Sequence, residues 1–133
     1  METRLLIGGD LAAGAGTPLG VEDPASGAVL ETLATASAEQ VDAALAAARD
    51  AQPGWERTPA AERGELLHAV AAWLREHTEE IAVVMTREGG KPLLENRDEV
   101  GWTAACFDFY AELGRAHAGR VIPPVESTQL ALV

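Results

Sequence analysis

Several features are scarce in this sequence, and each scarcity argues against a class of protein. The 133-residue chain contains one cysteine, so it cannot form an internal disulfide bond. Only 10 lysine and arginine residues stand against 21 acidic ones, and the formal net charge is -11. Nucleic acids and anionic membrane surfaces are bound by basic patches, so neither is expected as a partner.

Long apolar stretches are also missing. No segment approaches the about 20 consecutive apolar residues of a membrane-spanning helix. The N-terminal sequence METRLLIGGD lacks the apolar region of a signal peptide. A single cysteine fits a reducing compartment, and these features together predict a cytoplasmic protein.

The N-terminal residues 1–36 have the pattern of a small β-hairpin unit. A short apolar run ends at Gly8 and Gly9, which predicts a strand followed by a turn. Further along, DPASG places proline and glycine where a type I turn with a bulge requires them. Strands are therefore predicted at residues 19–22 and 29–34.

Residues 37–119 are predicted to form four helices. Ser37 with Gln40 is a capping box that begins the first helix, and Pro53-Gly54 is expected to end it. Thr58 and Thr78 are expected to cap the second and third helices.

The fourth helix is predicted over residues 93–118, with Gly119 as its end. Its apolar residues form two stripes, which predicts a helix packed between two layers. The first stripe is Val100, Ala104, Phe107 and Ala111, and the second is Trp102, Cys106, Phe109 and Leu113. Cys106 is therefore expected to be buried and unreactive. Residues 120–133 are extended and end in an apolar run that predicts a strand without a partner in this chain.

The stretch Gly89-Gly90-Lys91-Pro92 could be a phosphate-binding loop or a helix end. A phosphate loop follows a strand and ends in Gly-Lys-Ser or Gly-Lys-Thr, whereas here a helix precedes and proline follows. We expect Gly90 to end the third helix with a positive φ and Lys91 to lie near that helix's carbonyl groups.

Two other patterns suggest binding sites only weakly. Glu65-x-x-His68 is one motif of a carboxylate-bridged di-metal site, which needs two such motifs and two more glutamates, and His68 is expected to be solvated. Gly14-x-Gly16 begins like a dinucleotide fingerprint, but the next glycine, Gly20, comes one residue late and no helix follows. From these residues we nominate no catalytic, cofactor-binding or metal-binding residue.

The order of the motifs resembles the N-terminal quarter of the NAD(P)-dependent aldehyde dehydrogenase superfamily. The resemblance runs through LLIGGD, DPASGAVLETLA, AALAAARDAQPGW, PAAERGELLHAVAAWL, EGGKP, FYAEL and GRVIPP, and so covers nearly the whole chain. No single motif is specific, but their order is. Asp23 replaces the family's usual asparagine, and Gly89 replaces its usual threonine.

The resemblance implies an α/β fold for the full-length enzyme, which would oxidise an aldehyde to a carboxylic acid with NAD or NADP. Residues 37–119 would be the helical part of the cofactor-binding domain. Residues 120–133 would begin the oligomerisation strands and be cut short. The remainder of the polypeptide and other subunits would be the partners. The family's catalytic cysteine and general base lie further along, and Glu99 matches a structural cation ligand only loosely.

The resemblance therefore implies that this chain is scaffold, is inactive alone and holds no cofactor. Two alternatives remain at this point. The chain could be an autonomous acidic helical interaction module without enzymatic activity. It could also be a metal-binding helical bundle, which would depend on Glu65 and His68.

Overall fold

The computed structural model describes residues 2–116, 119, 121–122 and 131–132. This part of the chain contains four helices and three two-stranded antiparallel sheets. The elements are β1 (Leu5–Ile7), β2 (Asp10–Ala12), β3 (Pro18–Glu22), β4 (Val29–Ala34), α1 (Ala38–Arg57), α2 (Ala60–Glu76), α3 (Thr78–Gly89), α4 (Leu93–Ala116), β5 (Val121–Ile122) and β6 (Ala131–Leu132).

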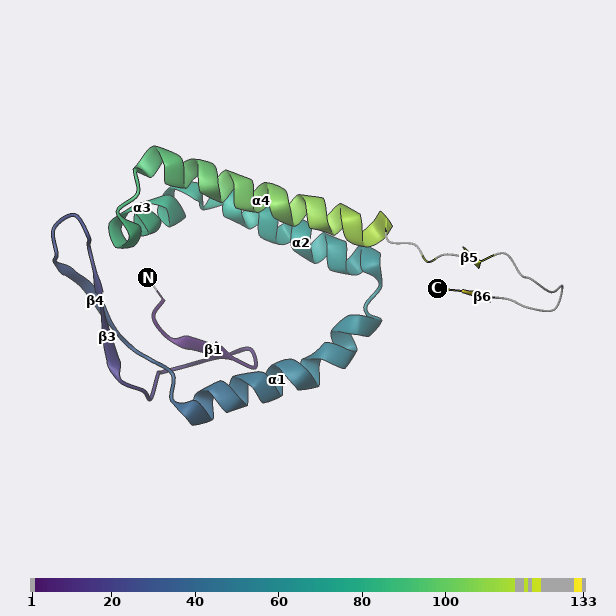
Figure 1. Ribbon diagram of the computed structural model, residues 1–133, viewed down its shortest axis with the longest axis horizontal. Helices are drawn as coiled ribbons and strands as arrows, with labels where there is room; N and C mark the ends of the chain where they lie inside the picture. The colour runs from purple at the N-terminus through teal and green to yellow at the C-terminus, as the bar shows by residue number, and fades with distance from the viewer. Residues whose placement is uncertain (1, 117–118, 120, 123–130, 133) are drawn as a thin grey trace.

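The helices α2, α3 and α4 form one packed group, and α1 runs apart from them (Figure 1). The β1–β2 hairpin lies along α1, and the β3–β4 hairpin lies at the end of the group where α3 is found (Figure 1). Strands β5 and β6 extend beyond the end of α4 (Figure 1). The helix-rich prediction with an N-terminal hairpin unit is confirmed.

Both N-terminal hairpins depend on glycines with positive φ. Gly8 (φ 62°) and Gly9 (φ 95°) form the two-residue turn between β1 and β2. Between β3 and β4, the Gly27 N–H donates to the Asp23 carbonyl oxygen at 2.7 Å, and the register shifts at Val21/Glu22. The predicted strands, turn and bulge are confirmed, whereas β2 was not predicted.

The start of α1 is the predicted capping box. The Ser37 hydroxyl accepts from the Gln40 N–H, and the Gln40 side-chain oxygen accepts from the Ser37 N–H at 3.1 Å. The predicted end at Pro53-Gly54 is wrong, because the helix continues to Arg57 with Pro53 inside it. A proline removes one helical hydrogen bond, and the remaining bonds carry the helix past it.

Thr58 and Thr78 do not cap the starts of α2 and α3, as had been predicted. Thr58 is the C-cap of α1, where its N–H donates to the Trp55 carbonyl oxygen, while Pro59 precedes α2. Thr78 is the first residue of α3, and its hydroxyl donates to carbonyl groups in the last turn of α2. A threonine between two helices can satisfy either end, and the sequence alone did not reveal which.

Small residues bring the packed helices close together. The buried hydrophobic residues of the described chain are Ala71, Ala82, Val100, Ala104 and Ala111. A Cβ added to Gly64 of α2 would lie 3.2 Å from the Ala111 carbonyl oxygen, so the backbones of α2 and α4 almost touch there. The first predicted stripe of α4 is thus confirmed as the core-facing side.

The second stripe of α4 is not buried in this structure. Trp102 is 76% exposed, Phe109 and Leu113 are exposed as well, and Cys106 is an exposed free thiol. The expectation of a buried Cys106 is therefore wrong for this chain, because α2 and α3 cover only one side of α4. Among the described residues, no helix has the length and apolarity needed to cross a membrane.

The C-terminal strands also differ from the expectation. β6 pairs with β5 in an antiparallel register, with Val121 opposite Leu132, so the apolar run does have a partner in this chain. α4 was predicted to reach residue 118 and is described to Ala116, because residues 117–118 lie outside the described part. Of the extended segment predicted at 120–133, only residues 121–122 and 131–132 are described.

Candidate functional site

The glycine-lysine stretch between α3 and α4 is a helix end. Gly90 has φ 73° and ψ 3°, and its N–H donates to the Thr86 carbonyl oxygen at 2.9 Å, as the sequence predicted. Asn96, which is 1% exposed, donates from its side chain to the Thr86 hydroxyl at 2.8 Å and to the Lys91 carbonyl oxygen. The loop is thereby fixed against α4 and follows a helix, so it is not built as a phosphate loop.

Lys91 was predicted to lie near the carbonyl groups of α3, and its described side-chain contacts are with carboxylates of α4. Its ammonium group donates to the carboxylate of Glu99 and lies 3.8 Å from that of Glu95. These carboxylates raise the pKa of Lys91, mainly through the hydrogen bond to Glu99. Glu99, the loosely matched cation ligand, is therefore paired with an ammonium group of its own chain.

Cys106 shares an open hollow of about 570 Å³ with Lys91 and Trp102. Glu95, Asp98 and Glu99 also line this hollow. Activated cysteines occur in electropositive surroundings or at helix N-termini, whereas Cys106 lies within α4 beside an excess of carboxylates. This arrangement does not form a nucleophilic centre.

Gly14 and Gly16 are positions of close backbone approach. A Cβ on Gly14 would lie 2.0 Å from the Ala34 carbonyl oxygen, and one on Gly16 would lie 2.5 Å from the Thr35 hydroxyl. The Gly16 N–H donates to the Thr35 carbonyl oxygen at 2.7 Å. The pair therefore packs the loop against residues 34–36 and does not open toward a dinucleotide.

A charged ladder, made of Glu65, His68 and Arg75 on α2 with Asp108, Glu112 and Arg115 on α4, joins the two helices. His68 lies between two carboxylates, with its Nδ1 2.7 Å from Asp108 and its Nε2 2.9 Å from Glu112. Arg75 donates to the other oxygen of Asp108. The expectation that His68 is solvated is wrong, because its side chain is only 33% exposed and both ring nitrogens are engaged.

The contacts within the ladder shift the pKa values of His68 and Asp108. Hydrogen bonds that the ring donates to Asp108 and then to Glu112 raise the pKa of His68. The Arg75 guanidinium, followed by His68, lowers the pKa of Asp108. Sequence reasoning missed the ladder because its two halves are about 40 positions apart, but spacings of three and seven on α2 and of four and three on α4 were a visible signal.

The ladder is not a metal centre. The two ring nitrogens of His68 face opposite ways, so Asp108 and Glu112 cannot share one ion with it. Across residues 2–116, which hold all of the ladder, no group of three or more histidine, cysteine, aspartate or glutamate residues is arranged to bind a metal. Glu65 pairs with Arg115 at 3.6 Å.

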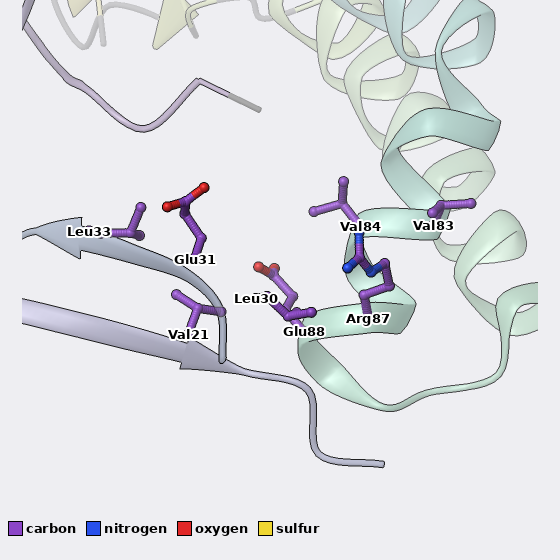
Figure 2. A pocket seen from close by; sticks show the side chains of 8 residues that line it. All are labelled: Val21, Leu30, Glu31, Leu33, Val83, Val84, Arg87 and Glu88. Carbon is purple, nitrogen blue, oxygen red and sulfur yellow. The ribbon is translucent and has the colours of Figure 1, made fainter. Parts of the chain in front are cut away.

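A third feature is a cavity of about 200 Å³ between the β3–β4 hairpin and α3. Figure 2 shows Val21, Leu30 and Leu33 on the hairpin side, facing Val84 and Arg87 on α3. Glu31 and Glu88 are the acidic residues among those that line it. The lining is mainly aliphatic, so the cavity can accommodate apolar groups, with charged side chains at Glu31, Arg87 and Glu88.

The sequence matches the model of the aldehyde dehydrogenase family over residues 12–133. It is 42% identical over 121 residues to 4-(hydroxymethyl)benzenesulfonate dehydrogenase TsaD1 of Comamonas testosteroni, covering 90% of this chain and 25% of that protein. It is 35% identical over 121 residues to succinate-semialdehyde dehydrogenase [NADP(+)] GabD of Escherichia coli strain K12, with the same two coverages of 90% and 25%.

A solved structure of PnpE, in complex with nicotinamide adenine dinucleotide, superposes on this chain with a TM-score of 0.91 at 36% identity. PnpE is from Pseudomonas sp. WBC-3. The superposition covers 98% of this chain and 27% of PnpE. The chain thus spans about a quarter of the length of the curated relatives it matches.

Proposed function

Because the chain belongs to the aldehyde dehydrogenase family, we propose that it is the N-terminal scaffold of an enzyme that oxidises an aldehyde to a carboxylic acid. The match to the family over residues 12–133 is the observation that carries this proposal. The related proteins include one bound to NAD and one whose name specifies NADP, and we propose one of these two as the hydride acceptor.

The contribution of this chain is structural. Aldehyde oxidation of this kind needs a thiolate next to a bound nicotinamide, and Cys106 lies instead on the exposed side of α4 among carboxylates. The charged ladder and the loop at Gly90 hold α2, α3 and α4 together. In this proposal these helices support groups that other segments supply.

The described residues do not fit a dinucleotide. A pyrophosphate site needs a glycine-rich turn between a strand and a helix N-terminus. Gly14 and Gly16 are instead pressed against the backbone of residues 34–36. We therefore assign no cofactor-binding role to this chain alone.

The partners we propose are the remaining segments of such an enzyme and further copies of it. The support comes from exposed apolar side chains on α4, such as Trp102 and Phe109, on the side that α2 and α3 leave uncovered. No specific observation favours an autonomous interaction module as a second function.

A chimera tests the proposal directly. In GabD, the segment that matches this chain is replaced by residues 12–133, and NADPH formation with succinate semialdehyde is measured. We expect the chimera to retain activity, because a scaffold from the same family presents the same helices to the rest of the enzyme. The isolated chain should form no NADH or NADPH with a panel of aldehydes.

Cys106→Ala in the chimera is the matched control. It should leave the rate of NADPH formation unchanged, since this thiol is not part of the proposed chemistry. A chimera that is folded and oligomeric but inactive would contradict the scaffold role. Turnover by the isolated chain that disappears in Cys106→Ala would contradict the placement of the catalytic group elsewhere.

A further inference from the structure

Both ring nitrogens of His68 face carboxylate oxygens of α4, at 2.7 Å for Asp108 and 2.9 Å for Glu112. An ionised carboxylate can only accept hydrogen bonds, and a neutral imidazole carries a single N–H. Both contacts can therefore be hydrogen bonds only when the ring is doubly protonated. In the neutral ring, one nitrogen lone pair would face a carboxylate oxygen at under 3 Å.

The other charges of the ladder point to the same state. Three carboxylates, those of Glu65, Asp108 and Glu112, face two guanidinium groups, those of Arg75 and Arg115. An imidazolium at His68 supplies the third positive charge. Asp108 and Glu112 are also four residues apart on one helix, where like charges repel, and the cation between them offsets that repulsion.

Asp108 and Glu112 differ in their contacts and in their exposure. Asp108 is also bound by Arg75 and its side chain is 33% exposed, whereas Glu112 is 64% exposed and contacts only His68 in the ladder. When the ring loses a proton, Nδ1–H can stay on Asp108. Glu112 is then the group that is repelled, and it is free to turn into the solvent.

We propose that His68, Asp108 and Glu112 form a pH-responsive clamp between α2 and the C-terminal part of α4. With the ring charged, both carboxylates are tied to α2. With the ring neutral, the contact at Glu112 opens. This contact lies next to the close packing of Gly64 against Ala111, and the ion pair of Glu65 with Arg115 still joins the last turn of α4 to α2. The clamp does not depend on the proposed enzymatic activity.

The direction of the pH effect follows from the raised pKa of His68. A pKa that is higher in the folded chain stabilises it fully below the unfolded value of about 6.5. That stabilisation is lost as the pH rises through the folded pKa. Asp108 acts oppositely, because its lowered pKa stabilises the fold until the pH falls through that value. The clamp is therefore closed in mild acid and opens on the alkaline side.

The test is an NMR titration of the histidine ring carbons in the 133-residue chain, with His68→Gln and His77→Gln used for assignment. We expect His68 to titrate above about 6.5. In Glu112→Gln the midpoint should move down toward that value. Glutamine can donate to a neutral Nε2, so the contact survives in this variant without the charge.

Thermal unfolding from pH 6 to pH 9 is the second measurement. The midpoint of the wild-type chain should fall over this range, and the fall should be smaller in both His68→Gln and Glu112→Gln. His77→Gln is the matched control, because His77 stacks on Trp73 outside the ladder, and it should keep the wild-type dependence. If the isolated chain aggregates, both measurements are made in the GabD chimera. A His68 midpoint at or below the reference value, or a wild-type pH dependence in His68→Gln, would overturn the clamp.

Discussion

Gly90 occupies the one position between α3 and α4 that only glycine suits. Its φ of 73° is disfavoured for other residues, and a Cβ there would lie 2.7 Å from Cγ of Pro24. We predict that Gly90→Ala lowers the free energy of unfolding by at least about 1 kcal/mol. Chemical denaturation monitored by circular dichroism measures the effect.

The neighbouring glycine provides the control. Gly89 is the last residue of α3, it does not have a positive φ, and a Cβ built on it would meet no side chain or distant backbone within 4 Å. Gly89→Ala should therefore be neutral or stabilise the chain by up to about 1 kcal/mol. Equal losses in both variants would show that the αL conformation is not the cause.

Cys106 is predicted to react readily with a thiol reagent in the native chain. Its side chain is exposed on α4, so no unfolding is needed for access. Labelling with an uncharged maleimide, which the carboxylates of the hollow do not repel, should proceed without denaturant and approach the rate of the denatured chain. A native rate many times slower would mean that the second stripe of α4 is covered in solution.

The conformation of Gly90 could be predicted from the sequence, whereas the contacts of Gly14 and His68 could not. The positive φ of Gly90 follows from its place after a helix, which is a local relation. The role of Gly14 depends on the backbone of Ala34, and the pairing of His68 depends on Asp108. Those neighbours become known only when the packing of distant elements is known.

At the scale of elements, Gln40 connects α1 to the loop before β3. Its side-chain oxygen accepts from the N–H groups of Ser37 and Ala15, and its Nε2 donates to the Ala13 carbonyl oxygen at 2.8 Å. We predict that Gln40→Ala lowers the free energy of unfolding by about 2 kcal/mol, since it removes a cap contact and two further hydrogen bonds. Urea denaturation tests this value.

Gln40→Glu separates the two functions of this side chain. A glutamate keeps the capping box and its charge suits a helix N-terminus, but it cannot donate to Ala13. The expected loss is smaller than that of Gln40→Ala, and hydrogen exchange should increase in residues 13–15 but not in the first turn of α1. Increased exchange in both segments would contradict this separation.

The start of α1, the end of α3 and the tight turns were predicted well because their signals lie within a few residues, whereas the caps predicted for α2 and α3 were wrong. The capping box at Ser37, the turn at Gly27 and the end of α3 are of this kind. The end of α1 was predicted wrongly, because a proline is a strong local signal that the rest of a 20-residue helix overrides. β2 was missed because Asp10-Leu11-Ala12 contains no β-branched or aromatic residue.

At the scale of the whole molecule, the described part of the chain leaves many large apolar side chains exposed. The exposed large hydrophobic residues include Trp102, Phe109 and Tyr110 on α4, and Leu66 and Trp73 on α2. Apolar surface of this extent is typical of faces that other protein segments cover.

We therefore predict that the isolated chain self-associates and binds a hydrophobic dye despite its net charge of -11. Trp102→Lys should reduce both effects, because Trp102 is 76% exposed and its removal costs little packing within the chain. Sedimentation velocity and dye fluorescence are the measurements. A monomeric wild-type chain that binds no dye would contradict the prediction.

Trp102→Lys both adds a positive charge and removes apolar surface, and the variant Ala105→Lys separates these two effects. Ala105 is also exposed on α4, so a lysine there alters the net charge equally while leaving Trp102 in place. Each added lysine weakens the repulsion between acidic chains, which on its own favours association. If Trp102→Lys lowers association while Ala105→Lys leaves it unchanged or raises it, apolar contact on α4 is the driving force.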